Sequence, residues 1–216
     1  MRIEKLNENT KKNLLDDLLK RSPNNYGKFE ASVQEILNAV KEKGDEAVFD
    51  YTEKFDGVRL DAENLLVTEE EIAEAYEQVD DELIAIIRKA LVNIRDYHQK
   101  QMQYSWFDSK PDGTILGQKI TPLHRVGVYV PGGKAVYPSS VLMNIMPAKV
   151  AGVDKIIMTT PCNAEGKVNP AVLVAAKEAG ADEVYKAGGA QAIAALAFGT
   201  ESIPKVDKIV GPGNIY

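Results

Sequence analysis

The chain has 216 residues, of which 44% are hydrophobic and 27% are charged, a balance typical of globular proteins. No apolar run is long enough to span a bilayer, and the N-terminal residues lack the apolar core of a signal peptide. The net charge of −6 argues against general nucleic-acid binding, and a single cysteine permits no internal disulfide, so we expect a cytoplasmic protein.

Charge is divided unevenly between the two halves of the chain. Residues 1–108 contain 15 Lys and Arg against 24 Asp and Glu, a net charge of −9. Residues 109–216 contain 11 against 8, a net charge of +3. The second half is therefore predicted to be the more favourable one for an anionic ligand.

Residues 1–25 predict a small separate element. Asn9 or Thr10 is a candidate N-cap for a helix, which Ser22–Asn25 would end. The apolar face of this helix would carry Leu14, Leu15, Leu18 and Leu19. Because a short amphipathic helix cannot bury its apolar face alone, we expect it to dock on the body of the protein or, by exchange within a dimer, on a partner chain.

Residues 26–125 are predicted to be mainly helical. Helical periodicity indicates helices at Lys28–Lys43, Asp45–Phe55 and Asp81–Tyr104. A capping box formed by Thr68 and Glu71 predicts the start of a fourth helix between the last two, after a short extended segment. The carboxylates of this acidic region are typical of solvated helix faces.

A hairpin is predicted in the connector formed by residues 112–125. Asp112-Gly113 is a turn signal, and the arms Thr114–Leu116 and Gln118–Thr121 flank Gly117. His98 is interpreted as a surface or capping histidine, because it has no partner three or four residues away that would help it bind a metal. His124 is also interpreted as structural.

From Arg125 onward, strands alternate with helices, which predicts an α/β fold with a parallel sheet. The predicted strands are Arg125–Val130, Asp154–Thr160, Asp182–Ala187 and Lys205–Val210. Each strand is followed by a Gly- or Pro-containing loop, in residues 131–133, 161–163, 188–191 and 211–214. Because right-handed crossovers bring these loops to one edge, they are expected to lie where open α/β sheets bind ligands.

The helices between these strands carry their own start and stop signals. Ser139 or Ser140 is a candidate cap for the first crossover helix, and Pro147 is expected to kink it or to begin a new segment. Pro170–Gly180 predicts a second helix, with Pro at its start and Gly as its C-cap.

The third of these loops predicts a phosphate site. Gly188 and Gly189 precede an alanine-rich helix and leave its first N–H groups open to an anion, while Gln191 can bond a ribose or a base. Tyr129 lies at the rim of the same edge or in the core, and Asn214 can point its amide into the same crevice. The G-x-G-x-x-G fingerprint is absent, so the residues alone predict a nucleotide or another phosphorylated ligand.

Cys162 follows the second predicted strand of this half. A catalytic thiol needs a nearby base or an electropositive setting, and the sequence shows neither. Cys162 is therefore interpreted as an inert thiol.

Three motifs of the second half resemble, in order and spacing, those of histidinol dehydrogenases. They are Arg125–Gly133 (RVGVYVPGG), Gly188–Thr200 (GGAQAIAALAFGT) and Gly211–Asn214 (GPGN). The resemblance implies an α/β fold with an incomplete Rossmann-like parallel sheet, preceded by a mainly helical region. It implies an N-terminal helical element in residues 1–25, part of a split domain in residues 26–125, and a truncated NAD-binding domain in residues 126–216.

Members of this family are zinc-dependent homodimers of histidine biosynthesis, which oxidise L-histidinol to L-histidine through L-histidinal in two NAD-dependent steps. The resemblance implies that Tyr129, Gln191 and Asn214 contact NAD. The zinc ligands, the Glu-His acid–base pair and most histidinol contacts of the family lie beyond residue 216. Neither His98 nor His124 matches those positions, so the resemblance places no catalytic residue and no metal ligand in this chain.

We therefore expect an N-terminal fragment of the enzyme that is inactive alone, exposes apolar surface and tends to associate. Two alternatives come from other classes of protein. One is a non-catalytic nucleotide-binding module, and the other is an assembly fragment in which the acidic helices drive oligomerisation.

Overall fold

A computed structural model describes residues 7–12, 27–132 and 136–213. The chain divides into two compact units, residues 1–35 and 36–216. In the first unit, residues 8–12 are helical, and Asn7 caps them by accepting a hydrogen bond from the Thr10 N–H at 2.9 Å. The expected caps, Asn9 and Thr10, instead lie within the helix, because Asn7 already supplies the capping oxygen. The four leucines expected on its apolar face lie outside the described residues.

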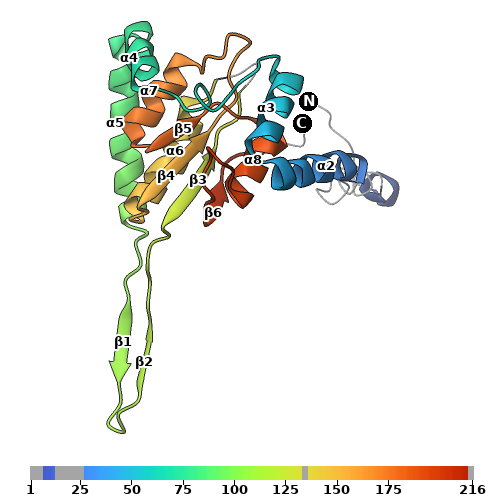
Figure 1. Ribbon diagram of the computed structural model, residues 1–216. Helices are drawn as coiled ribbons and strands as arrows, with labels where there is room; N and C mark the ends of the chain where they lie inside the picture. The colour runs from blue at the N-terminus through green and yellow to red at the C-terminus, as the bar shows by residue number, and fades with distance from the viewer. Residues whose placement is uncertain (1–6, 13–26, 133–135, 214–216) are drawn as a thin grey trace. The chain divides into compact units, whose positions relative to one another are not determined.

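The second unit is built on a four-stranded parallel sheet (Figure 1). Its strands are β3 (Arg125–Tyr129), β4 (Lys155–Thr159), β5 (Glu183–Tyr185) and β6 (Lys208–Val210). Their order across the sheet is β5-β4-β3-β6. The predicted α/β class and the four predicted strands are confirmed, with each strand one to three residues shorter at one or both ends.

Helices cover both faces of this sheet (Figure 1). One layer contains four helices that pack against one another: α4 (Glu69–Gln78), α5 (Asp81–Gln99), α6 (Pro138–Val150) and α7 (Pro170–Ala179). On the other face, α3 (Asp45–Asp56) packs against α8 (Gly189–Phe198). α2 (Gly27–Lys43) contributes Ile36 and Val40 to the apolar core of the second unit. None of the helices in the described residues has the length and the apolar character needed to cross a membrane.

The predicted capping box is confirmed at the start of α4. The Thr68 hydroxyl accepts from the Glu71 N–H, and the Glu71 carboxylate accepts from the Thr68 N–H. The extended segment before it, Leu65–Val67, runs antiparallel to the end of β5, because the Val67 N–H donates to Val184 and the Lys186 N–H donates to Leu65. This segment covers the outer edge of β5 and so protects it from pairing with another chain.

The predicted N-cap of α6 is wrong, and Pro147 does not begin a new segment. The helix begins after Tyr137 with Pro138 in its first turn, so Ser139 and Ser140 lie inside it rather than at its cap. Pro at this place has the right φ angle and lacks an N–H that the first turn would leave unpaired. The helix also continues past Pro147 to Val150, because its buried side chains hold it against the sheet. They are Val141, Leu142, Ile145 and Met146.

The predicted end of α5 is also wrong, since the helix ends at Gln99 rather than Tyr104. Its buried residues stop at Leu91, and Tyr97 is 62% exposed. Beyond Tyr97 the sequence continues the helical period to Gln101 and Tyr104, but both of these side chains are exposed. The next helix prediction, for Pro170–Gly180, is confirmed, with Asn169 as N-cap and Gly180 as a left-handed C-cap.

The connector does form a hairpin, but its arms differ from the predicted ones. β1 (Trp106–Ser109) pairs with β2 (Ile115–Gln118), so the first arm precedes Asp112-Gly113. Gly117 lies within β2, where a Cβ atom would come within 2.3 Å of the Trp106 carbonyl oxygen. The glycine permits close strand pairing and does not break the strand.

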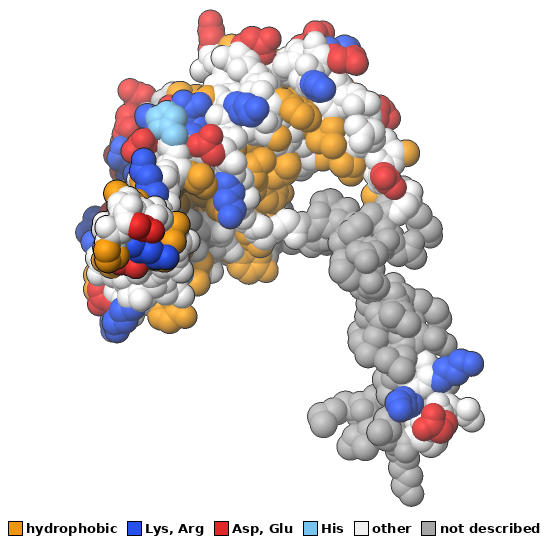
Figure 2. Space-filling view, turned by 90° about the horizontal axis from the view of Figure 1, so that it is seen from below, with side chains coloured by type: hydrophobic (Ala, Val, Ile, Leu, Met, Phe, Trp, Pro, Cys, Tyr) orange, Lys and Arg blue, Asp and Glu red, His pale blue; other side chains and the backbone are white. Residues whose placement is uncertain are grey.

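Every residue of this hairpin is exposed, including Trp106, Phe107, Ile115 and Leu116. Figure 2 shows hydrophobic side chains open to solvent among charged ones on the face that it presents. Contiguous exposed apolar side chains of this kind are typical of surfaces that associate.

Candidate functional site

The strand order places a topological switch point between β3 and β6. The chain leaves β3 through α6 and β4 through α7, on one face of the sheet, whereas it leaves β5 through α8 on the other face. β6 then returns beside β3, on the side opposite β4. In open α/β sheets, ligands bind in the crevice at the carboxyl ends of the strands that flank such a point.

Tyr129 is the last residue of β3 and therefore lies at this switch point. The side chain is half-buried, and this burial raises the pKa of its phenol, while a hydrogen bond from the Gly189 N–H acts in the opposite direction. The hydroxyl of Tyr129 therefore lies near the start of α8.

The end of β6 approaches Tyr129 closely on the other side. Gly211 has a φ angle of 142°, and a Cβ atom there would lie 2.2 Å from the Tyr129 carbonyl oxygen. Only glycine adopts this backbone readily and leaves the required space. The first glycine of the loop after β6 is therefore needed to bring the two flanking strand ends together.

Gln191 is the third residue of α8 and is only 1% exposed. Its Oε1 has no hydrogen-bond partner among the described residues. The side-chain amide folds back over the helix start, because a Cβ atom on Gly189 would lie 2.7 Å from Oε1. Gly189 thus contacts both Tyr129 and Gln191, and the structure brings these two predicted site residues together.

The start of α8 also has no capping side chain, as a phosphate site requires. The N-cap residue Gly188 has no side chain and makes no capping hydrogen bond, and Gly189 has a φ angle of 61°. Gly188 packs so closely on Pro161 that a Cβ atom would lie 2.7 Å from the proline ring. Backbone N–H groups at the positive end of the helix dipole attract an anion.

A neighbouring cavity of about 360 Å³ lies between α4, α7 and the loops that follow β3 and β4. It is lined by Glu71, Glu74, Gly132, Cys162 and Lys167, among others, but not by Tyr129 or Gln191. Burial and the charge of Asp56 raise the pKa of the Cys162 thiol. The protonated form is therefore favoured, as expected for an inert thiol.

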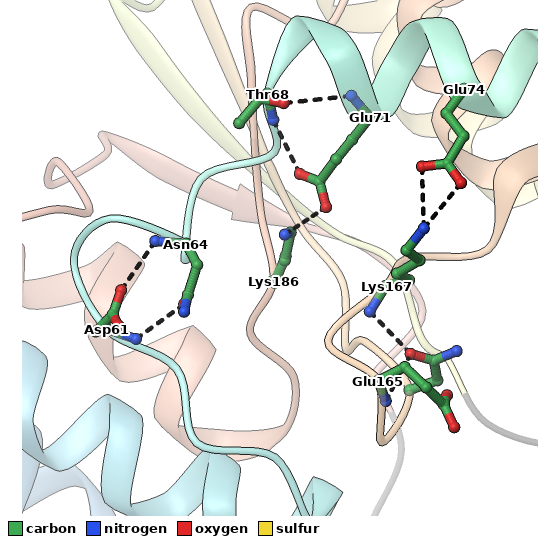
Figure 3. A network of polar contacts seen from close by, with 9 residues as sticks. Asp61, Asn64, Thr68, Glu71, Glu74, Glu165, Lys167 and Lys186 are labelled. Atoms are coloured by element: carbon green, nitrogen blue, oxygen red, sulfur yellow. Dashed lines mark hydrogen bonds and ion pairs between the residues drawn. The ribbon is translucent and has the colours of Figure 1, made fainter.

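Three lysines of the second half of the chain are paired with glutamates of α4 (Figure 3 shows two of these pairs). The pairs are Lys167–Glu74 at 2.8 Å, Lys177–Glu69 at 2.8 Å and Lys186–Glu71 at 2.6 Å. These ammonium groups are neutralised by the acidic half of the chain. An anion at the switch point would therefore depend on the N-terminus of α8 rather than on these lysines.

The histidines lie apart from this edge of the sheet. His124 contacts Asp154 at 3.0 Å, with both side chains more than two-thirds exposed, and His98 contacts Gln101 at 2.7 Å. In the part of the chain that the structure describes, no group of three or more His, Cys, Asp and Glu residues could hold a metal ion. Asn214, the third predicted contact, lies outside the described residues.

Sequence reasoning missed one polar residue of this region, Asp56 at the end of α3. The helix predicted at Asp45–Phe55 includes Asp56 as its last residue and ends at Gly57, a left-handed C-cap. Asp56 is half-buried, and burial raises the pKa of its carboxyl group. A charged residue placed directly before a helix-ending glycine, after an apolar helix face, is a signal that could have drawn attention to it.

Comparison with known proteins gives one consistent result. A model of the histidinol dehydrogenase family matches residues 19–216. Histidinol dehydrogenase of Geobacillus kaustophilus is 59% identical over 185 residues, which cover 86% of this chain and 43% of that protein. The Bacillus subtilis histidinol dehydrogenase is 57% identical with the same coverage.

A solved structure agrees with these sequence matches. The crystal structure of histidinol dehydrogenase from Elizabethkingia anophelis matches with a TM-score of 0.81 at 39% identity, over 86% of this chain and 42% of that one. The chain thus spans less than half the length of the relatives that it matches.

Proposed function

Because this chain belongs to the histidinol dehydrogenase family, we propose that it forms the nucleotide-binding part of an enzyme that oxidises L-histidinol to L-histidine through L-histidinal. The electron acceptor would be NAD, two molecules of which would be reduced. The observation that carries the proposal is the meeting of Tyr129, Gly189 and Gln191 at the switch point of the sheet.

The residues of this edge fit the chemical groups of a dinucleotide. The uncapped start of α8 offers backbone N–H groups to a pyrophosphate. The buried Oε1 of Gln191 lacks a donor among the described residues and can accept one from a ribose hydroxyl or an amide. We assign the third contact to Asn214, in the loop after β6, on the strength of the family resemblance.

When bound, NAD would accept hydride from the alcohol and then from the hydrated aldehyde. The role of this chain would be to hold and orient that cofactor. The family resemblance also supports zinc, a homodimer and a cytoplasmic location as parts of the proposal. We assign no zinc ligand and no catalytic residue to this chain, on the strength of the family resemblance.

Calorimetric titration of the 216-residue chain with NAD tests the site. We expect weak binding that is abolished in Gln191→Ala and in Asn214→Ala. Gln118→Ala is the matched control, because Gln118 is an exposed amide in the hairpin, away from the sheet edge. Loss of binding in the control, or undiminished binding in both site variants, would contradict the assignment.

An assay for NADH formation with L-histidinol tests the division of labour. The purified chain is expected to show no turnover, since the proposal places the acid–base and zinc chemistry elsewhere. Measurable oxidation of histidinol would overturn that. Tight binding of NAD with no effect of histidinol would favour a nucleotide-binding module, and a defined oligomer that binds no NAD would favour an assembly fragment.

A further inference from the structure

Four buried side-chain oxygens have no hydrogen-bond partner among the described residues. They are Oγ1 of Thr52, Oδ2 of Asp56, Oγ1 of Thr159 and Oε1 of Gln191. Buried polar atoms in native proteins are nearly always paired, so an unpaired one calls for a specific explanation. These four atoms are therefore candidate contacts for a bound molecule.

These four oxygens come from elements that meet around the switch point. Thr52 and Asp56 are four residues apart and so lie on the same face of α3, the helix that packs against α8. Gln191 belongs to the first turn of α8. Thr159 is the last residue of β4 and is in register with Tyr129.

Asp56 is the least favourable of the four for the stability of the fold. It is the last residue of α3, where the helix dipole disfavours a negative charge. It is half-buried, and Oδ2 has no donor among the described residues. The charge of Asp56 contributes to the raised pKa of both Tyr129 and Cys162, and α3 packs against α8, whose first turn carries Gln191. A residue that breaks several local rules at a binding edge is typical of a functional position.

The chemistry of the unpaired atoms restricts the ligand group that can satisfy them. The carboxylate oxygen of Asp56 and the amide oxygen of Gln191 only accept hydrogen bonds, so the ligand must present donors there. A phosphate has no donor when ionised and would be repelled by Asp56. A ribose presents vicinal hydroxyl groups, and carboxylates bind ribose hydroxyls in dinucleotide sites.

We propose that Asp56 accepts a hydrogen bond from a ribose hydroxyl of the nucleotide, next to the pyrophosphate at the start of α8. The inference rests on the proposed NAD function, and it assigns Asp56 as a positioning and recognition residue of that site. The Asp56 carboxylate then binds the ribose hydroxyl, and the N–H groups at the start of α8 bind the phosphate oxygens.

The test compares Asp56→Asn and Asp56→Ala with the parent 216-residue chain. We expect NAD affinity to fall about tenfold or more in both variants, the loss typical of a hydrogen bond to a charged group. Inorganic pyrophosphate, which has no ribose, should bind Asp56→Asn at least as well as it binds the parent. Glu46→Gln removes an exposed carboxylate from the same helix and should leave NAD affinity unchanged.

Thermal unfolding of the same proteins separates recognition from structure. Asp56→Asn should unfold at the same temperature as the parent or higher, because it removes an uncompensated buried charge. A lower unfolding temperature together with weaker binding would show a structural role and overturn the inference.

The remaining outcomes separate this inference from the proposed function. If the parent binds NAD, Gln191→Ala loses binding and Asp56→Asn keeps it, the role of Asp56 is wrong and the nucleotide site stands. If the folded parent binds no NAD, the nucleotide site in this chain fails, and the role of Asp56 fails with it.

Discussion

The ammonium group of Lys186 lies 2.6 Å from Oε1 of Glu71 and so joins the end of β5 to the capping box of α4 (Figure 3). The Lys186 side chain is only 6% exposed, and Glu71 is 24% exposed. The same Glu71 carboxylate accepts from the Thr68 N–H through its other oxygen. One carboxylate therefore caps a helix and neutralises a buried lysine that lies 115 positions away in the sequence.

Glu71→Gln is expected to destabilise the chain, because it leaves the buried ammonium group of Lys186 uncompensated. The expected loss in free energy of unfolding is about 2–4 kcal/mol, toward the range for breaking a buried ion pair. Urea denaturation followed by circular dichroism measures it. Glu69→Gln is the matched control, since Glu69 pairs with Lys177 at the exposed surface, where a loss of about 0–1 kcal/mol is expected. Equal losses in both variants would show that burial does not strengthen the Lys186 pair.

Gly211→Ala is expected to weaken both stability and NAD binding. The new Cβ atom would meet the Tyr129 carbonyl oxygen, and the φ angle of 142° is strained for any other residue. We expect a loss of about 1–3 kcal/mol in the free energy of unfolding, measured by urea denaturation. Gly213→Ala is the control in the same loop, because no atom of the described residues lies within 4 Å of a Cβ atom there. A Gly211→Ala chain as stable as this control would contradict the close approach of β6 to Tyr129.

Acid is expected to weaken the contact between Arg88 and Glu178. Hydrogen bonds from Arg88 and Tyr76 hold the pKa of Glu178 below its usual value. As pH falls, Glu178 therefore binds a proton in the unfolded chain before it does so in the folded chain. The stability that this carboxylate contributes at neutral pH is lost between its unfolded pKa and its lower folded pKa.

Unfolding free energies between about pH 7 and about pH 3 check this expectation. Arg88→Met should destabilise the chain at neutral pH and should lose less further stability on acidification than the parent. Arg95→Met, a change on the same helix, should follow the parent curve. Parallel curves for the parent and Arg88→Met would exclude the contribution of this pair.

The exposed hairpin is expected to make the chain associate at high concentration. Trp106 and Phe107 are 56% and 64% exposed, and Ile115 on the opposite strand is 66% exposed. Sedimentation velocity should show association that decreases in a Phe107→Ser, Ile115→Ser double variant. Because Trp106 is the single tryptophan of the sequence, its emission should shift to shorter wavelength as association buries it. A concentration-independent monomer with an unchanged emission maximum would contradict this role of the hairpin.

Local patterns in the sequence predicted most helices and strands and the family. The β-branched strand residues, the glycines that follow them and the helix signals at Thr68 and Pro170 act over a few residues, so their consequences could be predicted without coordinates. The same short-range logic failed at the N-cap of α6 and at the end of α5. At Pro147, packing on the sheet sustains α6 as one helix, whereas α5 ends at Gln99 after a last turn whose Tyr97 side chain is exposed.

The arrangement of the candidate site depends on contacts between distant parts of the chain. The order β5-β4-β3-β6, and with it the switch point beside Tyr129, depends on where β6 docks, which no local pattern encodes. The pairing of Lys186 with Glu71 arises in the same way, and so does the buried carboxylate oxygen of Asp56 that has no partner among the described residues. Charge and hydrogen-bonding groups are visible in a sequence, but whether each is compensated depends on neighbours brought together by folding from distant parts of the chain.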